Sequence, residues 1–334
     1  MINDLINDLS ASGEEQKALF NKAAEVKLNN VGNIVYLRGL IEMSNICEKD
    51  CYYCGIRKSN KNNIRYSLTL EEVIDLIRKA HNLGYGSVAI QTGEVSTKSF
   101  ISKIEKIVRE SKKITNNQIG ITLSCGEQTE ETYLRWFESG ADRYLLRIET
   151  SSEELYKKLH PNSNVYSYIN RLKALESLKR INYQVGTGVM IGLPFQTLED
   201  LSKDLLFMKE IDIDMCGMGP YIEHTQTPLY KYKDMLLPRS ERLDLGLRMI
   251  ALLRILMTNI NIAATTALQT LDKYGRVRAI LAGANVVMPN LSPANVRKKY
   301  MLYDNKISFG VEAAEGIENL RNHMADIGYE IAID

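Results

Sequence analysis

Residues 34–41 read IVYLRGLI, the first of several short apolar runs that alternate with helical patterns along the chain. The later runs begin near residues 87, 120, 143, 185, 215, 262 and 284. Short buried runs separated by helices are typical of a parallel sheet with helical crossovers. Eight such units in 334 residues predict an α/β fold of the TIM type, a closed (β/α)8 barrel, rather than an open doubly wound sheet with two domains.

The stretches between the apolar runs carry helical periodicity, and one of them has a clear start signal. Thr69 and Glu72 have the spacing of a capping box. We expect helices near residues 70–83, 98–113, 129–139, 151–159, 166–180, 198–210 and 239–257. The whole chain is predicted to have three parts: an N-terminal helical cap over 1–30, the barrel over 31–307 and a C-terminal helical tail over 308–334.

The composition narrows the class of protein. Hydrophobic residues make up 45% of the chain, enough for a large core, and the formal net charge is +1. A charge so close to zero argues against a nucleic-acid partner held by bulk electrostatics. No apolar stretch is long enough for a membrane helix, and the acidic N-terminal stretch does not resemble a signal peptide. We therefore expect a cytoplasmic protein that binds neither membranes nor nucleic acids.

Three of the five cysteines lie within eight residues, directly after the first apolar run. Five cysteines are too few and too unevenly spaced for a disulfide scaffold, and in a reducing compartment the clustering of Cys47, Cys51 and Cys54 indicates a metal. Three thiolates on one loop can hold three irons of a four-iron cluster and leave the fourth iron open to a small molecule. Zinc, or thiols without a metal, is the alternative, although none of the four histidines lies in this loop.

Other polar residues stand where predicted strands end, which is where barrel enzymes carry their sites. Arg143, Arg147 and Glu149 are separated by even numbers, so in a strand they share one face. Buried charges of this kind are costly unless they are paired or bind a ligand. The arginine and glutamate side chains therefore either bind a ligand or form an internal ion pair. Tyr300 and Tyr303 have the spacing of one helical face.

The cysteine loop resembles that of the radical S-adenosylmethionine (SAM) superfamily, whose pattern is Cys-x3-Cys-x2-Cys. Tyr53 matches the aromatic residue of that loop, and Gly93 and Glu94 match a Gly-Gly-Glu motif from which Thr92 departs. The resemblance implies one 4Fe-4S cluster bound by the three cysteines, with SAM on the open iron. One electron from the cluster would cleave SAM to methionine and a 5′-deoxyadenosyl radical, which then acts on a substrate inside the barrel.

Several strings resemble one branch of this superfamily, the HydE maturases of FeFe-hydrogenase. The strings at residues 264–267 and 283–290 are the most specific of them. The resemblance implies that cofactor-binding residues line SAM: Tyr53, Thr92, Gly93, Glu94, Glu149, Arg171, Met190 and Met218. It also implies that the candidate catalytic residues line an internal substrate cavity: Gln91, Thr122, Arg147, Thr265, Thr266, Met288 and Tyr303.

The same resemblance implies partners and a substrate. The substrate would be an iron–carbonyl–cyanide–cysteine complex made by a HydG-like maturase, and a HydF-like scaffold would receive later products. A reductant such as ferredoxin or flavodoxin would supply the electron. No cysteine follows Cys216, so we expect no second cluster. The alternatives are a related amino-acid mutase such as 3-methylornithine synthase and, among non-enzymes, an iron–sulfur scaffold or binding module.

Overall fold

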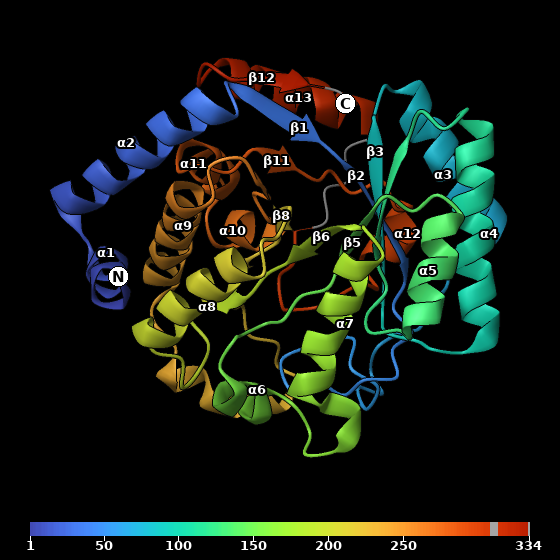
Figure 1. Ribbon diagram of the computed structural model, residues 1–334, viewed down its shortest axis with the longest axis horizontal. Coiled ribbons are helices and arrows are strands. Elements are labelled where there is room, and N and C mark those ends of the chain that lie inside the picture. The colour runs from blue at the N-terminus through green and yellow to red at the C-terminus, as the bar shows by residue number, and fades with distance from the viewer. Residues whose placement is uncertain (308–312, 333–334) are drawn as a thin grey trace.

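Seven parallel strands form one hydrogen-bonded sheet in the computed structural model, which describes residues 1–307 and 313–332. In spatial order they are β10 (Asn261–Ile262), β8 (Met215–Cys216), β6 (Gln184–Thr187), β5 (Arg143–Leu145), β4 (Gly120–Ser124), β3 (Ser87–Thr92) and β2 (Gly39–Ser44). Because every neighbouring pair is parallel, the carboxyl ends of these strands meet at one rim (Figure 1).

Two further strands close the sheet into a barrel. β1 (Ile34–Leu37) runs into β2 through Arg38 and pairs in parallel with β11 (Val286–Val287). Ala264 N donates to the carbonyl oxygen of Val286 at 2.8 Å, which joins β11 to the end of β10. The described residues thus form a ring with eight strand positions. The predicted (β/α)8 barrel is confirmed.

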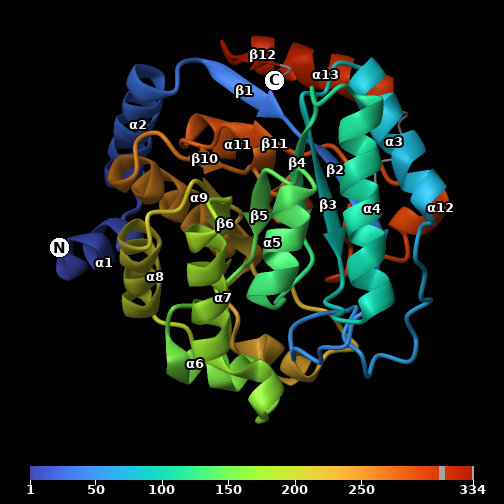
Figure 2. The same ribbon diagram turned by 45° about the vertical axis from the view of Figure 1, so that its right-hand side comes forward.

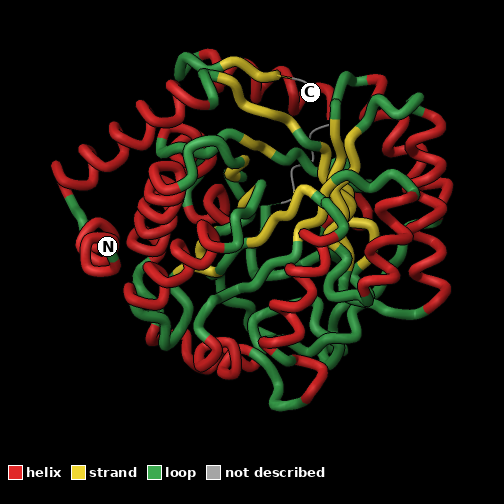
Figure 3. Tube along the Cα trace, viewed as in Figure 1, coloured by secondary structure: helices red, strands yellow, loops and turns green. Residues whose placement is uncertain are grey.

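Helices surround this ring of strands (Figures 2 and 3). The predicted helices appear as α3 (Leu70–Asn82), α4 (Lys98–Ile114), α5 (Glu130–Glu138), α6 (Glu153–Leu159), α7 (Tyr168–Arg180), α8 (Leu198–Glu210) and α9 (Arg239–Leu256). The capping box is confirmed, because Glu72 N donates to Thr69 Oγ1 at 3.1 Å and Thr69 N donates to Glu72 Oε2 at 2.7 Å. No helix of the described residues is long and apolar enough to cross a membrane.

The apolar runs that begin near residues 185 and 215 each contain a second short strand, β7 (Met190–Ile191) and β9 (Gly219–Pro220), which pair with each other. Several short helices were not predicted: the 3-10 helices η1 (Asn164–Tyr166) and η2 (Pro228–Met235) and the helices α10 (Thr266–Leu271), α11 (Gly275–Leu281) and α12 (Ala294–Arg297). Such elements span too few turns for a period to be read. The expected helical face at Tyr300 and Tyr303 is wrong, since α12 ends before them and an irregular segment follows.

The two chain ends pack on the barrel away from the rim loops. α1 (Ile2–Ser10) and α2 (Gly13–Asn30) pack against α8 and α9, so the N-terminal helices cover outer helices (Figure 1). The expected tail is not wholly helical, because α13 (Ala313–Ala325) is followed by β12 (Glu330–Ala332), which pairs in parallel with β1. Residues 308–312 and 333–334 of that tail lie outside the described residues. The division of the chain at residues 30 and 307 stays a prediction.

Aromatic side chains between the sheet and α5 support one of the rim loops. Trp136 and Tyr144 are fully buried with their rings stacked, and the Trp136 Nε1–H donates to the carbonyl oxygen of Ile101 at 3.0 Å. The hydroxyls of Tyr144 and Tyr133 both donate to the carbonyl oxygen of Gly126, at 2.8 and 3.3 Å. These two hydrogen bonds hold the loop after β4 in place.

Lys27 of α2 is fully buried where the two chain ends meet. Its Nζ donates to the carbonyl oxygen of Ile280 at 3.0 Å and lies 3.8 Å from the centroid of the Tyr329 ring. Burial, with a smaller contribution from Arg254, lowers the pKa of Lys27 to about 7. Between pH 7 and 10.5 the unfolded chain therefore binds a proton that the folded chain does not.

We expect Lys27→Met to remove a pH dependence of stability. Stability rises with pH wherever the unfolded state binds more protons, so the wild type should gain stability relative to the variant from pH 7 to 10 by up to ~1.4 kcal/mol per pH unit. Urea unfolding at several pH values measures this difference. Lys22→Met, at an exposed position of the same helix, is the control and should run parallel to the wild type. A difference in the free energy of unfolding between Lys27→Met and the wild type that stays the same at every pH would contradict the prediction.

Candidate active site in the barrel

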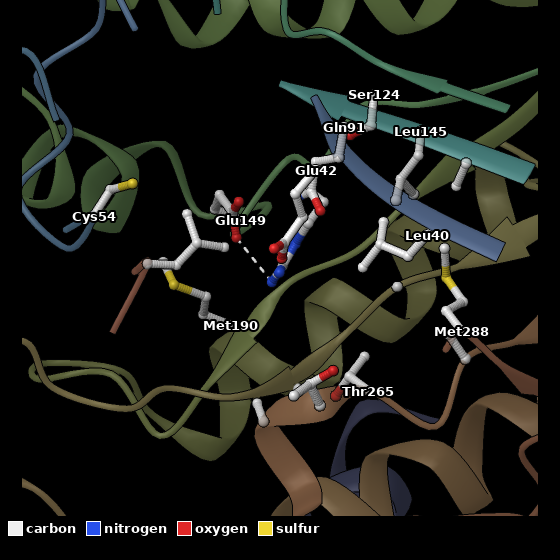
Figure 4. A pocket seen from close by; sticks show the side chains of 18 of the residues that line it. Leu40, Glu42, Cys54, Gln91, Ser124, Leu145, Glu149, Met190, Thr265 and Met288 are labelled. Atoms are coloured by element: carbon white, nitrogen blue, oxygen red, sulfur yellow. Dashed lines mark ion pairs between the residues drawn. The ribbon is translucent and has the colours of Figure 1, made fainter. Parts of the chain in front are cut away.

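A cavity of about 370 Å³ opens at the carboxyl ends of the strands. It gathers side chains from the loops after the strands and from the segment at residues 298–306, here called the closing segment. The structure places these predicted site residues on its wall: Cys47, Cys51, Tyr53, Cys54, Gln91, Thr92, Gly93, Glu94, Thr122, Arg147, Glu149, Arg171, Met190, Thr265, Thr266, Met288 and Tyr303. In Figure 4, Cys54 and Met288 lie at opposite ends of the cavity, and Thr265 lies across it from Gln91 and Ser124.

Met218 is the predicted site residue that does not reach this wall. Its side chain is fully buried in the hydrophobic core. Gly217 and Gly219 line the cavity on either side of it, and successive residues of an extended chain point to opposite faces. The expectation that Met218 contacts a ligand is therefore wrong for this structure.

The cysteine loop is held against the end of β3 by a contact that requires glycine. A Cβ at Gly93 would lie 2.2 Å from the carbonyl oxygen of Ile46 and 2.8 Å from the Cβ of Cys47. Glu94 N donates to Cys47 Sγ at 3.3 Å. The Arg65 guanidinium donates to the carbonyl oxygens of Asn45 and Ile56, both at 2.7 Å, and so joins the two ends of the loop.

The three thiols are free and face one cavity. Burial raises the pKa of each of them, that of Cys54 to about 12. Iron binds thiolates, so a bound metal's positive charge must offset this cost. The described His, Cys, Asp and Glu side chains include no group of three placed to hold a single metal ion. A four-iron cluster takes each thiol at a different iron, so it does not require the three sulfur atoms to meet at one ion.

Four charged side chains form a network beside the cysteine loop. Arg171 Nε lies 2.9 Å from Glu127 Oε1, and its Nη2 lies 3.6 Å from Glu94 Oε2. Lys49 Nζ lies 3.0 Å from Glu94 Oε1 and 3.7 Å from Glu127 Oε2. Burial raises the pKa of Glu127. An arginine in a helix is normally solvated, and Arg171 is buried here because its partners arrive on two other loops.

Arg147 and Glu149 form an ion pair on the cavity wall. Arg147 Nη2 lies 3.0 Å from Glu149 Oε2, the dashed line in Figure 4, and also donates to the carbonyl oxygen of Val189 at 2.9 Å. Burial raises the pKa of Glu149. Arg143 does not share this site, because its Nε donates to Gln184 Oε1 at the other end of β5. The predicted shared face fails since β5 ends at Leu145.

Glu149 has a backbone conformation that is rare for its residue type. Its φ of 68° lies in the left-handed region. The segment after it is anchored by Asp204 of α8, whose Oδ1 accepts hydrogen bonds from Ser151 N at 2.5 Å and Ser151 Oγ at 2.6 Å. Burial raises the pKa of Asp204 to about 7. This buried anchor holds the strained segment that presents the ion pair to the cavity.

Sequence reasoning missed a second ion pair, between Glu42 in the middle of β2 and Lys306 of the closing segment. Glu42 also accepts a hydrogen bond from Asn290 Nδ2 at 2.8 Å, and Lys306 Nζ donates to the carbonyl oxygen of Tyr300 at 2.9 Å. The closing segment is further bound by Gly55 N, which donates to the carbonyl oxygen of Leu302 at 2.8 Å. The two partners are far apart in sequence, so no local pattern predicts their pairing. The sequence signal that could have been used is Glu42 itself, an acidic residue inside an apolar strand.

Arg276 of α11 was also missed, and it lines the cavity. Its Nη2 donates to Thr266 Oγ1 at 3.0 Å. Its Nε and the hydroxyls of Thr122 and Thr265 are buried with no hydrogen-bond partner among the described residues. Unpartnered buried polar atoms are uncommon in proteins, so these three groups on the cavity wall favour a polar guest.

Comparisons with known proteins agree with this geometry. A family model for the Radical SAM superfamily matches residues 41–208. The HydE subunit of FeFe-hydrogenase maturase from Thermotoga maritima is 45% identical over 291 residues, 87% of this chain and 80% of that protein. A 3-methylornithine synthase from Methanosarcina acetivorans is 28% identical over 323 residues, 96% of this chain and 87% of that protein.

Two solved structures share the fold. Methylornithine synthase (PylB) superposes with a TM-score of 0.81 at 24% identity, covering 99% of this chain and 94% of that one. HydG, a maturase of FeFe-hydrogenase, superposes with a TM-score of 0.79 at 19% identity, covering 100% of this chain and 75% of that one. At these identities the likeness concerns the fold alone.

We expect Glu42→Gln to destabilise the protein by about 3 kcal/mol, because it leaves the Lys306 charge buried without its partner. The double variant Glu42→Gln/Lys306→Met removes both charges and should recover most of this loss. Urea unfolding measures all three proteins. Glu154→Gln breaks an exposed pair with Lys158 and is the matched control, with a change below ~0.5 kcal/mol. A Glu42→Gln effect as small as the control's would show that the buried pair does not hold the closing segment.

Proposed function

The chain belongs to the radical SAM superfamily and to its HydE branch, and we propose that it matures FeFe-hydrogenase by cleaving SAM and acting on a precursor of the di-iron subcluster. The observation that carries this proposal is the 45% identity to a HydE maturase over most of both chains. The single cavity that joins the cysteine loop to the residues expected for the substrate supports it.

The residues present fit the two groups that the family uses. Cys47, Cys51 and Cys54 are free thiols on one cavity wall and would hold a 4Fe-4S cluster. Side chains beside them would hold SAM: Tyr53, Glu94, Glu149, Arg171 and Met190. When bound, the cluster supplies the electron that cleaves SAM to methionine and a 5′-deoxyadenosyl radical. We propose one cluster, because no cysteine follows Cys216.

The chain's own contribution is to orient ligands and to shield them. Arg171 and Lys49 neutralise the acids beside the cysteine loop, so Glu94 can face a ligand's ammonium group without excess negative charge nearby. The closing segment covers the cavity with Tyr300, Leu302 and Tyr303. A carbon radical abstracts hydrogen from anything near it, and a covered cavity limits its encounters to the bound substrate.

We propose an iron–carbonyl–cyanide–cysteine complex as the substrate. Six cationic and three acidic side chains among the described residues line the cavity, which favours a guest with negative charge. A HydG-like enzyme would supply this substrate, a HydF-like scaffold would receive the later product, and ferredoxin or flavodoxin would supply electrons. Because all five cysteines are free, we place this chemistry in the reducing cytoplasm.

A second candidate is the rearrangement of an amino acid, as in 3-methylornithine synthase. Methylornithine synthase shares the fold over the full length of the chain. The 28% identity to a 3-methylornithine synthase is well below the 45% identity to a HydE maturase, so this function is the second candidate. Both candidates use SAM cleavage, so the substrate distinguishes them.

We expect Cys51→Ala to abolish iron–sulfur binding and SAM cleavage together, because three thiols are the least that holds three irons of a cluster. Iron content, the visible absorption of the reconstituted protein and 5′-deoxyadenosine release measure the two losses. Cys125→Ala changes a buried thiol of the core and is the matched control, which should keep both. Retained 5′-deoxyadenosine release by Cys51→Ala would contradict the assignment of the loop.

The deciding experiment is hydrogenase maturation in a mixture that is complete except for HydE. This protein, with its cluster rebuilt and SAM cleavage confirmed beforehand, should restore hydrogenase activity. Cys51→Ala serves as the inactive control. No recovery by a protein that cleaves SAM would overturn the maturase role, and 5′-deoxyadenosine release stimulated by lysine would then favour the mutase.

A further inference from the structure

Arg147 and Arg276 both line the cavity, but only one of them has a carboxylate partner among the described residues. Arg147 has a carboxylate partner, because its Nη2 lies 3.0 Å from Glu149 Oε2. Arg276 forms no ion pair with any carboxylate of the described residues, although both arginines line the cavity. The other charged groups of the wall near the cysteine loop and the closing segment are also paired. Arg276 therefore has positive charge available for a guest.

The surroundings of Arg276 make it unfavourable for its charge to remain without a counter-charge. Its Nε atom is buried, and burial lowers the pKa of Arg276 to about 10, so the group stays charged at neutral pH. Nη2 is engaged by Thr266 Oγ1, while Nε has no hydrogen-bond partner among the described residues. A buried charge without a counter-charge is unfavourable, and an anionic ligand removes that cost.

Hydroxyl groups next to Arg276 complete a polar pocket. Thr265 Oγ1 is buried with no hydrogen-bond partner among the described residues. Gly219 faces it, and a Cβ there would lie 2.6 Å from Thr265 Oγ1, so glycine keeps this space open. Figure 4 shows Thr265 on the wall away from Cys54, which separates this pocket from the cysteine loop.

We propose that Arg276, with Thr265 and Thr266, binds the carboxylate of an amino-acid-derived substrate. A guanidinium and two hydroxyls offer the donors that a carboxylate accepts, and charge-assisted bonds of this kind are among the strongest. Arg147 instead neutralises Glu149 and positions it. The proposal rests on the proposed function in taking a cysteine derivative as the substrate class, and it assigns the end by which that substrate is anchored.

The test combines a change in the protein with a change in the ligand. S-methyl-L-cysteine and its methyl ester differ in the carboxylate charge, and neither has a free thiol. Calorimetric titration of the cluster-loaded, SAM-bound protein without reductant measures binding without turnover. In the wild type, we expect the ester to bind roughly 10- to 100-fold more weakly than the acid. In Arg276→Gln, the affinity for the acid should fall by a similar factor, and the affinity for the ester should equal that of the wild type.

Arg147→Gln is the matched comparison, because it also removes one cavity arginine. The difference between acid and ester should persist in it. If the difference instead vanishes in Arg147→Gln and persists in Arg276→Gln, the proposal is overturned in favour of Arg147. Failure of the wild type to bind the acid at any soluble concentration would overturn it as well.

Two further results distinguish a loss of carboxylate binding by Arg276 from a folding defect and from a failure of the proposed function. Arg276→Lys keeps the charge and should retain part of the preference for the acid, and it replaces Arg276→Gln if that variant does not fold. The titration does not depend on hydrogenase maturation. An intact acid preference in a protein that fails to mature hydrogenase would leave the anchor standing and refute the maturase role, whereas successful maturation without the preference would refute the anchor alone.

Discussion

The parallel ring of strands is the constraint on which the site depends. Because neighbouring strands from β2 round to β10 run the same way, each delivers the loop at its carboxyl end to one rim. The thiols of the first loop, Glu94 of the loop after β3 and Arg147 of the loop after β5 therefore meet in a single cavity. A single reversed strand would send its loop to the other end of the barrel and take its side chains out of reach.

The charged side chains around this rim differ in whether they have partners of opposite charge. Beside the cysteine loop, Lys49, Glu94, Glu127 and Arg171 balance one another. Such a network holds side chains in place but leaves little net charge to attract a ligand. The wall around Arg276 differs, because it carries hydroxyls and a guanidinium that forms no ion pair with an acid of the described residues. The cavity thus has one compensated end and one end that favours anions.

The parts that the sequence predicts are those with a local cause. The capping box at Thr69 and the cysteine loop depend on residues within a few positions of one another, and both lie where expected. Features that depend on partners far along the chain could not be read in this way. The burial of Arg171 follows from two glutamates on other loops, and the Glu42–Lys306 pair joins a strand to a segment near the other end of the chain. The prediction for Met218 was wrong for another reason. Side chains alternate along an extended segment, and this alternation points Met218 toward the core.

The pairing of β1 has a consequence for how the chain is made on the ribosome. Both of its strand neighbours, β11 and β12, come from the last part of the chain, with Tyr36 opposite Val286 and Ile34 opposite Glu330. During synthesis the first strand therefore waits with an unpaired edge until almost the whole polypeptide has emerged. An open strand edge is a template for association with other chains. The nascent protein is thus most prone to aggregate in the interval before residue 286 leaves the exit tunnel, and a chaperone that covers residues 34–37 would act in that interval.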